Sequence, residues 1–349
     1  MSAPAIRALK ESFSAKITVL TSSMAAGITA SLPEIDDVII FDLPWVKAKE
    51  TLGGDAIFTL TNQLKQREFD AAVIFTVFSQ NPLPSAMIAY MAGIPLRLAY
   101  CRENPYALLT NWVPDKEPYN FIQHQVERDL ALVESVGAKI DDHCLKLSVQ
   151  EAATQIVEAR LMDLGVNTAK PWIIFHAGVS EKKREFPPGL WVEAARKIID
   201  AGFQILFTGS VSEKPMCDEL ARQTGANAFS LGGVLKLNEF ISLIKNTRVV
   251  VSVNTGTVHI AAAVNTPVVV LYAQTNPQHT PWMVGSKVLE YEVPEDVRSK
   301  NEVIQYLYKN VYNKPVSMPS ADAIYNAVME LLQETPALSS DYLRPYTTA

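Results

Sequence analysis

The sequence predicts an α/β protein with two Rossmann-like, parallel-sheet domains that face a cleft, and three observations support this prediction. The chain has 349 residues, a length that suits two domains with a full core in each. Its second half alternates short apolar runs with helical segments of roughly ten residues, the pattern of a doubly wound parallel sheet. The stretch Arg248–Thr280 holds two valine-rich runs typical of strands that are buried on both faces.

The elements of the second half follow from this alternation. The expected strands are Trp172–Phe175, Phe203–Phe207, Ala228–Leu231, Val249–Val253 and Val268–Tyr272. The expected helices are Gly189–Ala201, Glu213–Thr224, Leu237–Lys245 and Thr257–Val264. Ligands of such sheets bind beyond the carboxyl ends of the strands, so we expect the turns at those ends to surround one ligand.

The first half repeats the alternation less clearly. The expected helices are Pro4–Phe13, Thr21–Ala30, Gly54–Arg67, Ser85–Ala92 and Phe121–Val136. The expected strands are Lys16–Leu20, Val38–Phe41, Ala71–Phe75 and Leu96–Tyr100, and the proline-containing stretch Cys101–Pro118 is expected to be an irregular loop. The pattern breaks near Asp163–Lys170, which predicts domains at 1–163 and 170–320 and a C-terminal helix and tail at 320–349.

Composition excludes several classes of protein. A net charge of -6 argues against a nucleic-acid partner, which requires a basic face. The three cysteines, Cys101, Cys144 and Cys217, have no metal-site or disulfide spacing, so a reducing cytoplasm is expected. No apolar run is long enough to span a membrane, and charged residues interrupt the N-terminus where a secretion signal needs an apolar core.

The turn between the strand Val249–Val253 and the following helix has the features of a phosphate site. Asn254 is suited to cap the helix, and Gly256 lets a ligand approach the backbone closely. His259 falls in the first helical turn, at the positive end of the helix dipole. The alternative interpretation is an ordinary joint between a strand and a helix, with a histidine on the surface.

Several stretches carry the motifs of one protein family. Ser252–His259 is similar to a pattern in which a strand ends in Ser-x-Asp-Ser/Thr-Gly and a His follows shortly after. His176–Ser180 and Lys183–Pro187 are similar to His-Pro-Gly-Ala-Ser and Lys-Arg-Trp-Pro, while Ala3–Lys10 and His124–Arg128 are similar to Thr-Pro-Ala-Leu-Arg-Ala-Leu-Lys and His-x-x-x-Arg. Together they resemble the bacterial heptosyltransferase-like glycosyltransferases of family 9, which have the GT-B fold.

This resemblance implies transfer of a sugar from a nucleotide-diphosphate donor, often ADP-heptose, to a growing lipopolysaccharide core. Transfer would invert the anomeric carbon and use no metal or cofactor, because a helix N-terminus and cationic side chains can stabilise the leaving diphosphate. The donor-binding residues that it implies are Gly178, Ser180, Lys183, Arg184, Glu213, Asn254, Thr255, Gly256, Thr257 and His259.

Simpler roles compete for some of these residues. Lys183 and Arg184 follow Lys182, so they also fit a solvated basic loop. Glu213 is expected to bind the nucleoside ribose, but a glutamate at a helix N-terminus can equally complement the helix dipole.

Two departures from the family pattern bear on activity. Asn254 stands where the family has Asp, which lessens repulsion of a diphosphate. The family also has a first strand ending in Gly-Asp before the Thr-Pro-Ala motif, and its Asp is the proposed general base; neither is found here. We therefore expect the first domain to lack its first strand, with about twenty more residues encoded upstream. No other carboxylate near the opening helix is expected at a strand end that points into the cleft, so the catalytic residue is unassigned.

These departures leave two other functions open. One is a catalytically silent protein that binds a nucleotide sugar, and the other is a sugar epimerase, although five histidines offer no epimerase-like set. The expected acceptor is a lipid-linked glycan, reached from the cytoplasm at the inner membrane. Acceptor contacts are expected at Gln80–Pro84 and Arg102–Pro105, for which simple turn chemistry is the alternative. Shallow membrane contact is expected at Trp45 or Phe75–Phe78, with a place in the core as the alternative.

Overall fold

The structure, a computed structural model, describes residues 1–46 and 53–334. It divides into two compact α/β units. The first contains Met1–Ser148 together with two later segments, Asn276–His279 and Ser299–Asn313. The second contains Val149–Thr275, Thr280–Arg298 and the chain from Lys314 onward.

The second unit is built on one parallel sheet of six strands in the order β11-β10-β9-β6-β7-β8. The strands are β6 (Trp172–His176), β7 (Gln204–Gly209), β8 (Ala228–Gly232), β9 (Val250–Val253), β10 (Val268–Ala273) and β11 (Ser286–Tyr291). The chain starts at β6, adds β7 and β8 on one side, and then adds β9, β10 and β11 on the other. The direction of winding therefore switches between β6 and β9, where doubly wound sheets bind their ligands.

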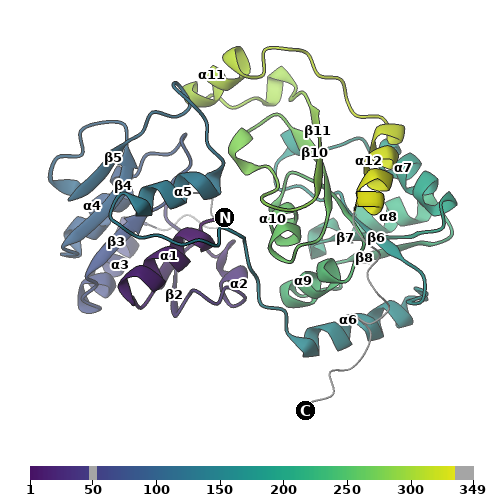
Figure 1. Ribbon diagram of the computed structural model, residues 1–349, viewed down its shortest axis with the longest axis horizontal. Coiled ribbons are helices and arrows are strands. Elements are labelled where there is room, and N and C mark those ends of the chain that lie inside the picture. Colours follow the sequence, from purple (N-terminus) through teal and green to yellow (C-terminus); the bar gives the residue numbers. More distant parts are fainter. Residues whose placement is uncertain (47–52, 335–349) are drawn as a thin grey trace. The chain divides into compact units, whose positions relative to one another are not determined.

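Helices cover both faces of this sheet (Figure 1). They are α6 (Glu151–Asp163), α7 (Pro188–Asp200), α8 (Lys214–Thr224), α9 (Leu237–Lys245), α10 (Gly256–Ala263) and α12 (Ala321–Glu334). On one face α7 packs against α8 and α12, and on the other α9 packs against α6 and α10. Every residue of β9 and β10 is buried, as the valine-rich runs predict for strands covered on both sides.

The first unit has five parallel strands in two separate sheets, β1-β2 and β3-β4-β5. The strands are β1 (Thr18–Thr21), β2 (Asp37–Ile40), β3 (Ala71–Ile74), β4 (Leu96–Cys101) and β5 (Asn111–Pro114). No described strand lies between β1 and β3, and no residue of either strand is fully buried. This differs from the buried centre of the second unit's sheet.

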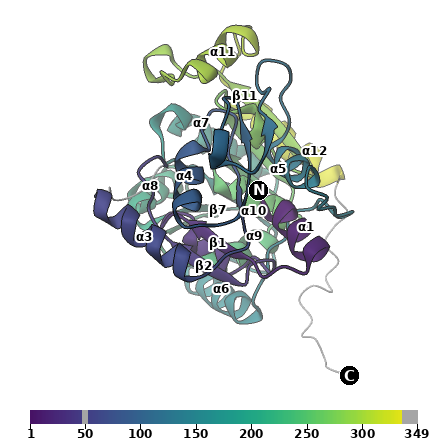
Figure 2. The same ribbon diagram turned by 90° about the vertical axis from the view of Figure 1, so that its left-hand side faces the viewer.

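The helices of the first unit include two packed pairs (Figure 2). The helices are α1 (Ala3–Phe13), α2 (Ala26–Thr29), α3 (Gly54–Gln66), α4 (Leu83–Met91), α5 (Gln125–Glu134) and α11 (Glu302–Asn310). Helix α1 packs against α5, and α3 packs against α4. Short 3-10 helices occur in the two units at Tyr106–Leu108, Lys182–Arg184, Val211–Glu213, Pro277–His279 and Glu295–Val297.

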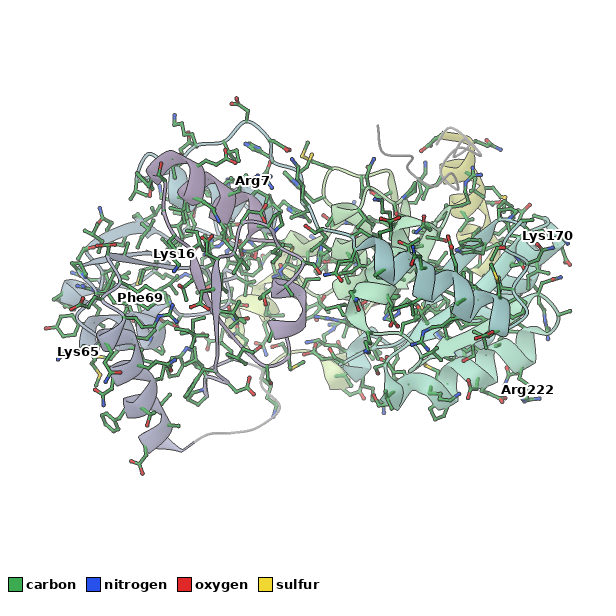
Figure 3. The ribbon with its side chains drawn as sticks, turned by 90° about the horizontal axis from the view of Figure 1, so that it is seen from below. Arg7, Lys16, Lys65, Phe69, Lys170 and Arg222 are labelled. Atoms are coloured by element: carbon green, nitrogen blue, oxygen red, sulfur yellow. The ribbon has the colours of Figure 1, made fainter. Side chains whose placement is uncertain are left out.

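A buried ion pair holds the opening helix in place. Arg7 of α1, labelled in Figure 3, donates to Glu34 Oε1 at 2.7 Å and is 9% exposed. Its other terminal nitrogen donates to the carbonyl oxygens of Asp142 and Cys144 at 2.8 and 2.9 Å. Because Arg7 bonds to three other residues, two of them more than 130 positions away in sequence, it fixes α1 against distant parts of the chain.

Three expectations for the first unit are wrong. Thr21–Ala30 is not one helix, because β1 extends to Thr21 and only Ala26–Thr29 is helical. Cys101–Pro118 is not irregular throughout, since β5 pairs with β4 in parallel. The helix expected from Phe121 begins at Gln125, because His124 is its N-cap and accepts a hydrogen bond from the Val126 amide.

The chain first passes from the first unit to the second between Ser148 and Val149. This point lies before Asp163–Lys170, where the sequence suggests the boundary. The reason is α6, which packs on α9 through Val157 and Leu161 of the second unit's core. Its weak amphipathic pattern gave no sign of this packing. The expected C-terminal helix is α12, and the expected tail lies outside the described residues.

None of the helices within residues 1–46 and 53–334 is long and apolar enough to cross a membrane. The residues expected to touch a membrane instead pack within the core or against it. Phe78 is 1% exposed, Phe75 packs against Val73 and Leu132, and Trp45 packs beside Leu43 and donates to Ser85 Oγ. They therefore give no support for a membrane contact.

The close packing of β8 on α8 predicts that a larger residue at Gly232 lowers the stability of the fold. A Cβ at Gly232 would lie 2.7 Å from the backbone Cα of Lys214 and 2.9 Å from Cys217 Cβ. Gly232→Ala should therefore lower the free energy of unfolding by about 1–3 kcal/mol, because strand and helix must separate. The control is Gly189→Ala, where a Cβ meets nothing within 4 Å. Equal urea midpoints for the two variants would contradict this packing.

Candidate functional site

The candidate site lies in the second unit, at the carboxyl ends of β6 and β9. These strands pair in parallel, with His176 opposite Ser252, so their following loops start at the same edge of the sheet. The loop after β6 leads to the 3-10 turn Lys182–Arg184, and the loop after β9 leads into α10. Arg184 joins the two loops, because its guanidinium donates to the carbonyl oxygen of Asn254 at 3.2 Å.

The N-terminus of α10 has no side-chain cap. Its N-cap is Thr255, which makes no side-chain capping bond because its hydroxyl is turned back to the Val253 carbonyl at 3.4 Å. The amides of a first helical turn have no acceptor within the helix. Gly256 is exposed with open space at its Cβ position, Thr257 is buried, and His259 is half-buried on the first turn. The geometry suits an anion.

The assignment of Asn254 as the helix cap is wrong. Its side chain instead bridges to the end of β10, with Nδ2 donating to the Ala273 carbonyl at 3.2 Å and to Thr275 Oγ1 at 3.1 Å. Its Oδ1 accepts from the Ala273 amide at 3.3 Å. These bonds tie the residue after β9 to the end of β10, and an amide can make them because it both donates and accepts. Asn254 therefore shapes the loop, and Thr255 begins the helix.

The turn after β6 carries two cationic side chains, Lys183 and Arg184. Lys183 Nζ lies 3.0 Å from Glu181 Oε2, and an Arg184 terminal nitrogen lies 3.7 Å from the same oxygen. Both side chains are 24% exposed, so the alternative of a fully solvated basic loop does not describe them. Tyr291 on β11 donates to the Arg184 carbonyl at 2.7 Å and holds the turn in place. Ser180, in the same loop, is exposed.

Glu213 comes into direct contact with Gly178. Its Oε2 accepts bonds from the Ser210 amide at 2.6 Å and the Ser210 hydroxyl at 2.8 Å, in a capping box. A Cβ at Gly178 would lie 2.3 Å from Glu213 Oε1, so any other residue here would have to displace this carboxylate. Glu213 therefore caps the start of a helical turn, which is the structural role that the sequence analysis gave as the alternative to ribose binding. One of its oxygens nevertheless faces the loop after β6.

His176, the last residue of β6, stood in a family motif, but sequence reasoning gave it no role in the site. Its Nδ1 lies 3.0 Å from Thr208 Oγ1, and its ring lies 5.4 Å from that of Phe240. Burial lowers the pKa of His176 to about 4, an effect that the nearby Glu213 partly offsets, so the imidazole is neutral at pH 7. The signal was available, because a histidine closing a buried strand stands at the ligand-binding edge.

The first unit has a separate polar cluster at the carboxyl ends of β3, β4 and β5. Arg128 is 1% exposed and binds Asp115 with both terminal nitrogens at 3.0 Å and Glu117 at 2.6 Å. Its guanidinium lies 4.2 Å from the ring centre of Tyr100 on β4. Gln278, from the segment Asn276–His279, donates to Glu117 at 3.2 Å. Arg128 therefore links α5 to Asp115 and Glu117, in the segment that follows β5.

The two segments expected to contact an acceptor also touch each other in the first unit. Asn81 Nδ2 donates to Glu103 Oε1 at 2.8 Å, and Arg102 donates to the Phe78 carbonyl at 2.9 Å. Thus Gln80–Pro84 and Arg102–Pro105 belong to one surface at the strand ends.

Comparison with known proteins places these features in a family. The model of glycosyltransferase family 9 (heptosyltransferase) matches residues 57–304. Lipopolysaccharide heptosyltransferase 2 of Escherichia coli (strain K12) is 26% identical over 275 residues, which cover 76% of each chain.

Two solved structures share the fold. The E. coli ADP-heptose lipopolysaccharide heptosyltransferase II superposes with a TM-score of 0.70 at 22% identity, covering 95% of this chain and 94% of that one. The E. coli heptosyltransferase WaaC, solved with ADP-2-deoxy-2-fluoro heptose, gives 0.63 at 19% identity and 94% coverage of each chain. Since the family match spans more than half of its residues, the chain belongs to glycosyltransferase family 9 and is a glycosyltransferase with two Rossmann-like units of the GT-B type.

Proposed function

We propose that this glycosyltransferase transfers heptose from ADP-heptose to a lipopolysaccharide core or a related lipid-linked glycan, with inversion and without a metal. The acceptor hydroxyl oxygen attacks the anomeric carbon while the bond to the diphosphate breaks, and ADP leaves with the electron pair. The relatives named for heptose transfer to lipopolysaccharide and lipooligosaccharide support this choice of donor and acceptor. A catalytically silent binding protein is not favoured, because these relatives are transferases.

The observation that carries the proposal is the junction of β6 and β9. The uncapped N-terminus of α10 offers backbone amides to the leaving diphosphate, and Lys183 and Arg184 offer positive charge beside it. Negative charge develops on the diphosphate in the transition state. Hydrogen-bond donors and positive charges that are already in position stabilise this charge more than water does. Glu213 and His259 complete the assignment, as the ribose ligand and as a donor to the diphosphate.

The acceptor is assigned to the first unit, where the surface around Asn81 and Glu103 lies at the strand ends. We place the enzyme in the cytoplasm, at the inner face of the membrane that carries such acceptors.

The direct test is transfer from ADP-heptose to a heptose-deficient lipopolysaccharide acceptor, followed by mass spectrometry. The expected result is a product heavier by one heptose, formed equally well in the presence of EDTA. A hundredfold excess of ADP over its Kd should also raise the free energy of unfolding by about 2.7 kcal/mol. Transfer from a different nucleotide sugar only would reject ADP-heptose, and a requirement for added metal would reject the metal-free mechanism.

The basic turn offers a matched pair of variants. Lys183→Ala should lower kcat/KM by roughly 10- to 100-fold, since a charge-assisted hydrogen bond is worth about 1.5–3 kcal/mol. Its neighbour Lys182 is exposed, and Lys182→Ala should leave kcat/KM within about twofold. Steady-state kinetics of both variants decides the matter. Equal losses would mean that the turn acts through general charge and that Lys183 has no specific role.

The contact between Gly178 and Glu213 can be tested by a double-mutant cycle. Gly178→Ala should push the Glu213 side chain aside and leave the fold intact, because the crowding atoms are the end of a flexible chain. Glu213→Ala removes the same carboxylate. Each change should weaken ADP binding about tenfold in calorimetry, and the double variant should be no weaker than either. Additive losses would show that Gly178 acts independently of Glu213.

A further inference from the structure

An exposed tyrosine lies beside an arginine at the strand ends of the first unit. Arg102 directly follows β4, and Tyr119 lies in the segment that follows β5. The guanidinium carbon of Arg102 lies 5.3 Å from the centre of the Tyr119 ring. Tyr119 is 48% exposed, although it is a large aromatic residue. Parallel sheets bind their ligands beyond the carboxyl ends of their strands, so this ring is placed to contact a ligand of the first unit.

Arg102 is held in place through one of its terminal nitrogens. Nη2 donates to the carbonyl oxygens of Phe78 at 2.9 Å and Glu117 at 2.5 Å, and it lies 3.4 Å from Asp115 Oδ2. Nε and Nη1 make no hydrogen bond to the described residues. A guanidinium carries more N–H groups than these contacts use, so Arg102 can donate further hydrogen bonds from a fixed position.

The ring of Tyr119 is also held, by a helix from far along the chain. Tyr306 on α11 meets it edge-on, with ring centres 4.9 Å apart and ring planes at 73°. Helix α11 belongs to the first unit, begins at the N-cap Asn301 and is anchored by the fully buried Leu307. An edge-to-face pair is a favourable arrangement of two aromatic rings. Tyr306 therefore fixes the orientation of a ring that stays half exposed.

The neighbouring residue adds a hydrogen-bond acceptor to this surface. Glu103 follows Arg102, and its Oε1 accepts a hydrogen bond from Asn81 Nδ2 at 2.8 Å. Its Oε2 makes no hydrogen bond to the described part of the chain. One surface therefore combines an aromatic ring, N–H donors and a carboxylate. This combination matches a pyranose, which has a face of C–H groups and, around its edge, hydroxyl groups that both donate and accept.

The charge of this surface disfavours an anionic sugar. The positive charge of Arg102 is met by Asp115, and Glu103 adds a second carboxylate. One arginine and two carboxylates sum to -1, and the exposed Lys116 of the same segment brings the sum only to zero. A phosphate or a sugar acid is recognised mainly by unbalanced positive charge. An uncharged sugar is therefore the ligand that fits.

We propose that Tyr119, Arg102 and Glu103 form a subsite for an uncharged pyranose of the acceptor glycan, with Tyr306 as a positioning residue behind Tyr119. This inference rests on the proposed transfer function and names the kind of acceptor sugar that the first unit holds. The C–H face of the pyranose lies on the Tyr119 ring, while its hydroxyl groups bond to Arg102 and Glu103. These contacts are the same before and during transfer, so they lower KM and leave kcat unchanged.

A second tyrosine–arginine pair in the first unit serves as a matched control. Tyr90 on α4 is 50% exposed, and the guanidinium carbon of Arg97 lies 5.4 Å from its ring centre. Arg97 is the second residue of β4, so this pair belongs to the amino end of the strand that leads to Arg102. The two pairs share their chemistry, and only the pair with Tyr119 lies at the edge where a parallel sheet binds ligands.

Steady-state transfer from ADP-heptose to a deacylated core oligosaccharide that ends in heptose gives the first test. Tyr119→Ala should raise KM for this acceptor about tenfold, with kcat and the KM for ADP-heptose unchanged. Tyr119→Phe keeps the ring and should behave as the wild type. Tyr306→Ala should raise the acceptor KM by a smaller factor, and Tyr306→Phe should restore it. Tyr90→Ala should leave every constant within about twofold.

Saturation-transfer NMR with the full chain measures binding of the sugar without transfer. With methyl heptopyranoside as the probe, saturation should reach the C–H protons of the sugar ring. The signal should disappear in Tyr119→Ala and persist in Tyr119→Phe and Tyr90→Ala. The methyl glycoside of a sugar acid should receive weaker saturation than the heptoside.

The inference and the proposed function fail in different ways. An unchanged acceptor KM in Tyr119→Ala, in a protein that transfers heptose, would overturn the inference alone. A lower unfolding temperature with equal losses for donor and acceptor would make Tyr119 a structural residue and overturn it too. Stronger binding of the sugar acid would overturn the assignment to an uncharged sugar. A wild-type protein that binds the heptoside through Tyr119 yet transfers no sugar would overturn the proposed function and leave the subsite in place.

Discussion

The parallel pairing of β6 with β9 is the constraint on which the donor site depends. It sets Ile174 beside Val250, Phe175 beside Val251 and His176 beside Ser252. A slip of one residue would turn buried side chains of β9 to the opposite face, so the core fixes this register. The register in turn starts the basic turn and helix α10 at the same edge of the sheet. The bond from Arg184 to the Asn254 carbonyl depends on that alignment.

Asn254 has a structural role in its loop, and the proposed stabilisation of charge lies with other residues. A carboxylate at this position could not donate to the Ala273 carbonyl, so the amide makes a bond to β10 that the family's Asp could make only when protonated. The amide also places no negative charge beside the expected diphosphate. In this chain Asn254 therefore serves the geometry of the loop, and the proposed charge stabilisation falls to the α10 amides, Lys183 and Arg184.

The sequence predicted the strands β6 to β10 because they are short, apolar and covered on both faces, as Val268–Ala273 illustrates. It missed the edge strand β11 (Ser286–Tyr291). Long-range packing decided the elements that it missed. The helix Glu151–Asp163 takes its place from α9, and the strand Asn111–Pro114 exists because β4 pairs with it. Motifs marked the candidate donor residues, and the structure brings Gly178 to Glu213 and Arg184 to Asn254. A motif marked His176, but it could not reveal the contact with Thr208, because that contact forms only when β6 and β7 pair.

The central claim is that the open end of α10 holds the diphosphate of the donor. A crystal structure of the full chain with ADP-2-deoxy-2-fluoro heptose would test it most directly. The account predicts diphosphate oxygens within hydrogen-bond distance of the Gly256 and Thr257 amides, with Lys183 or Arg184 alongside and the ribose at Glu213. A diphosphate bound elsewhere, for example at the Arg128 cluster of the first unit, would contradict it.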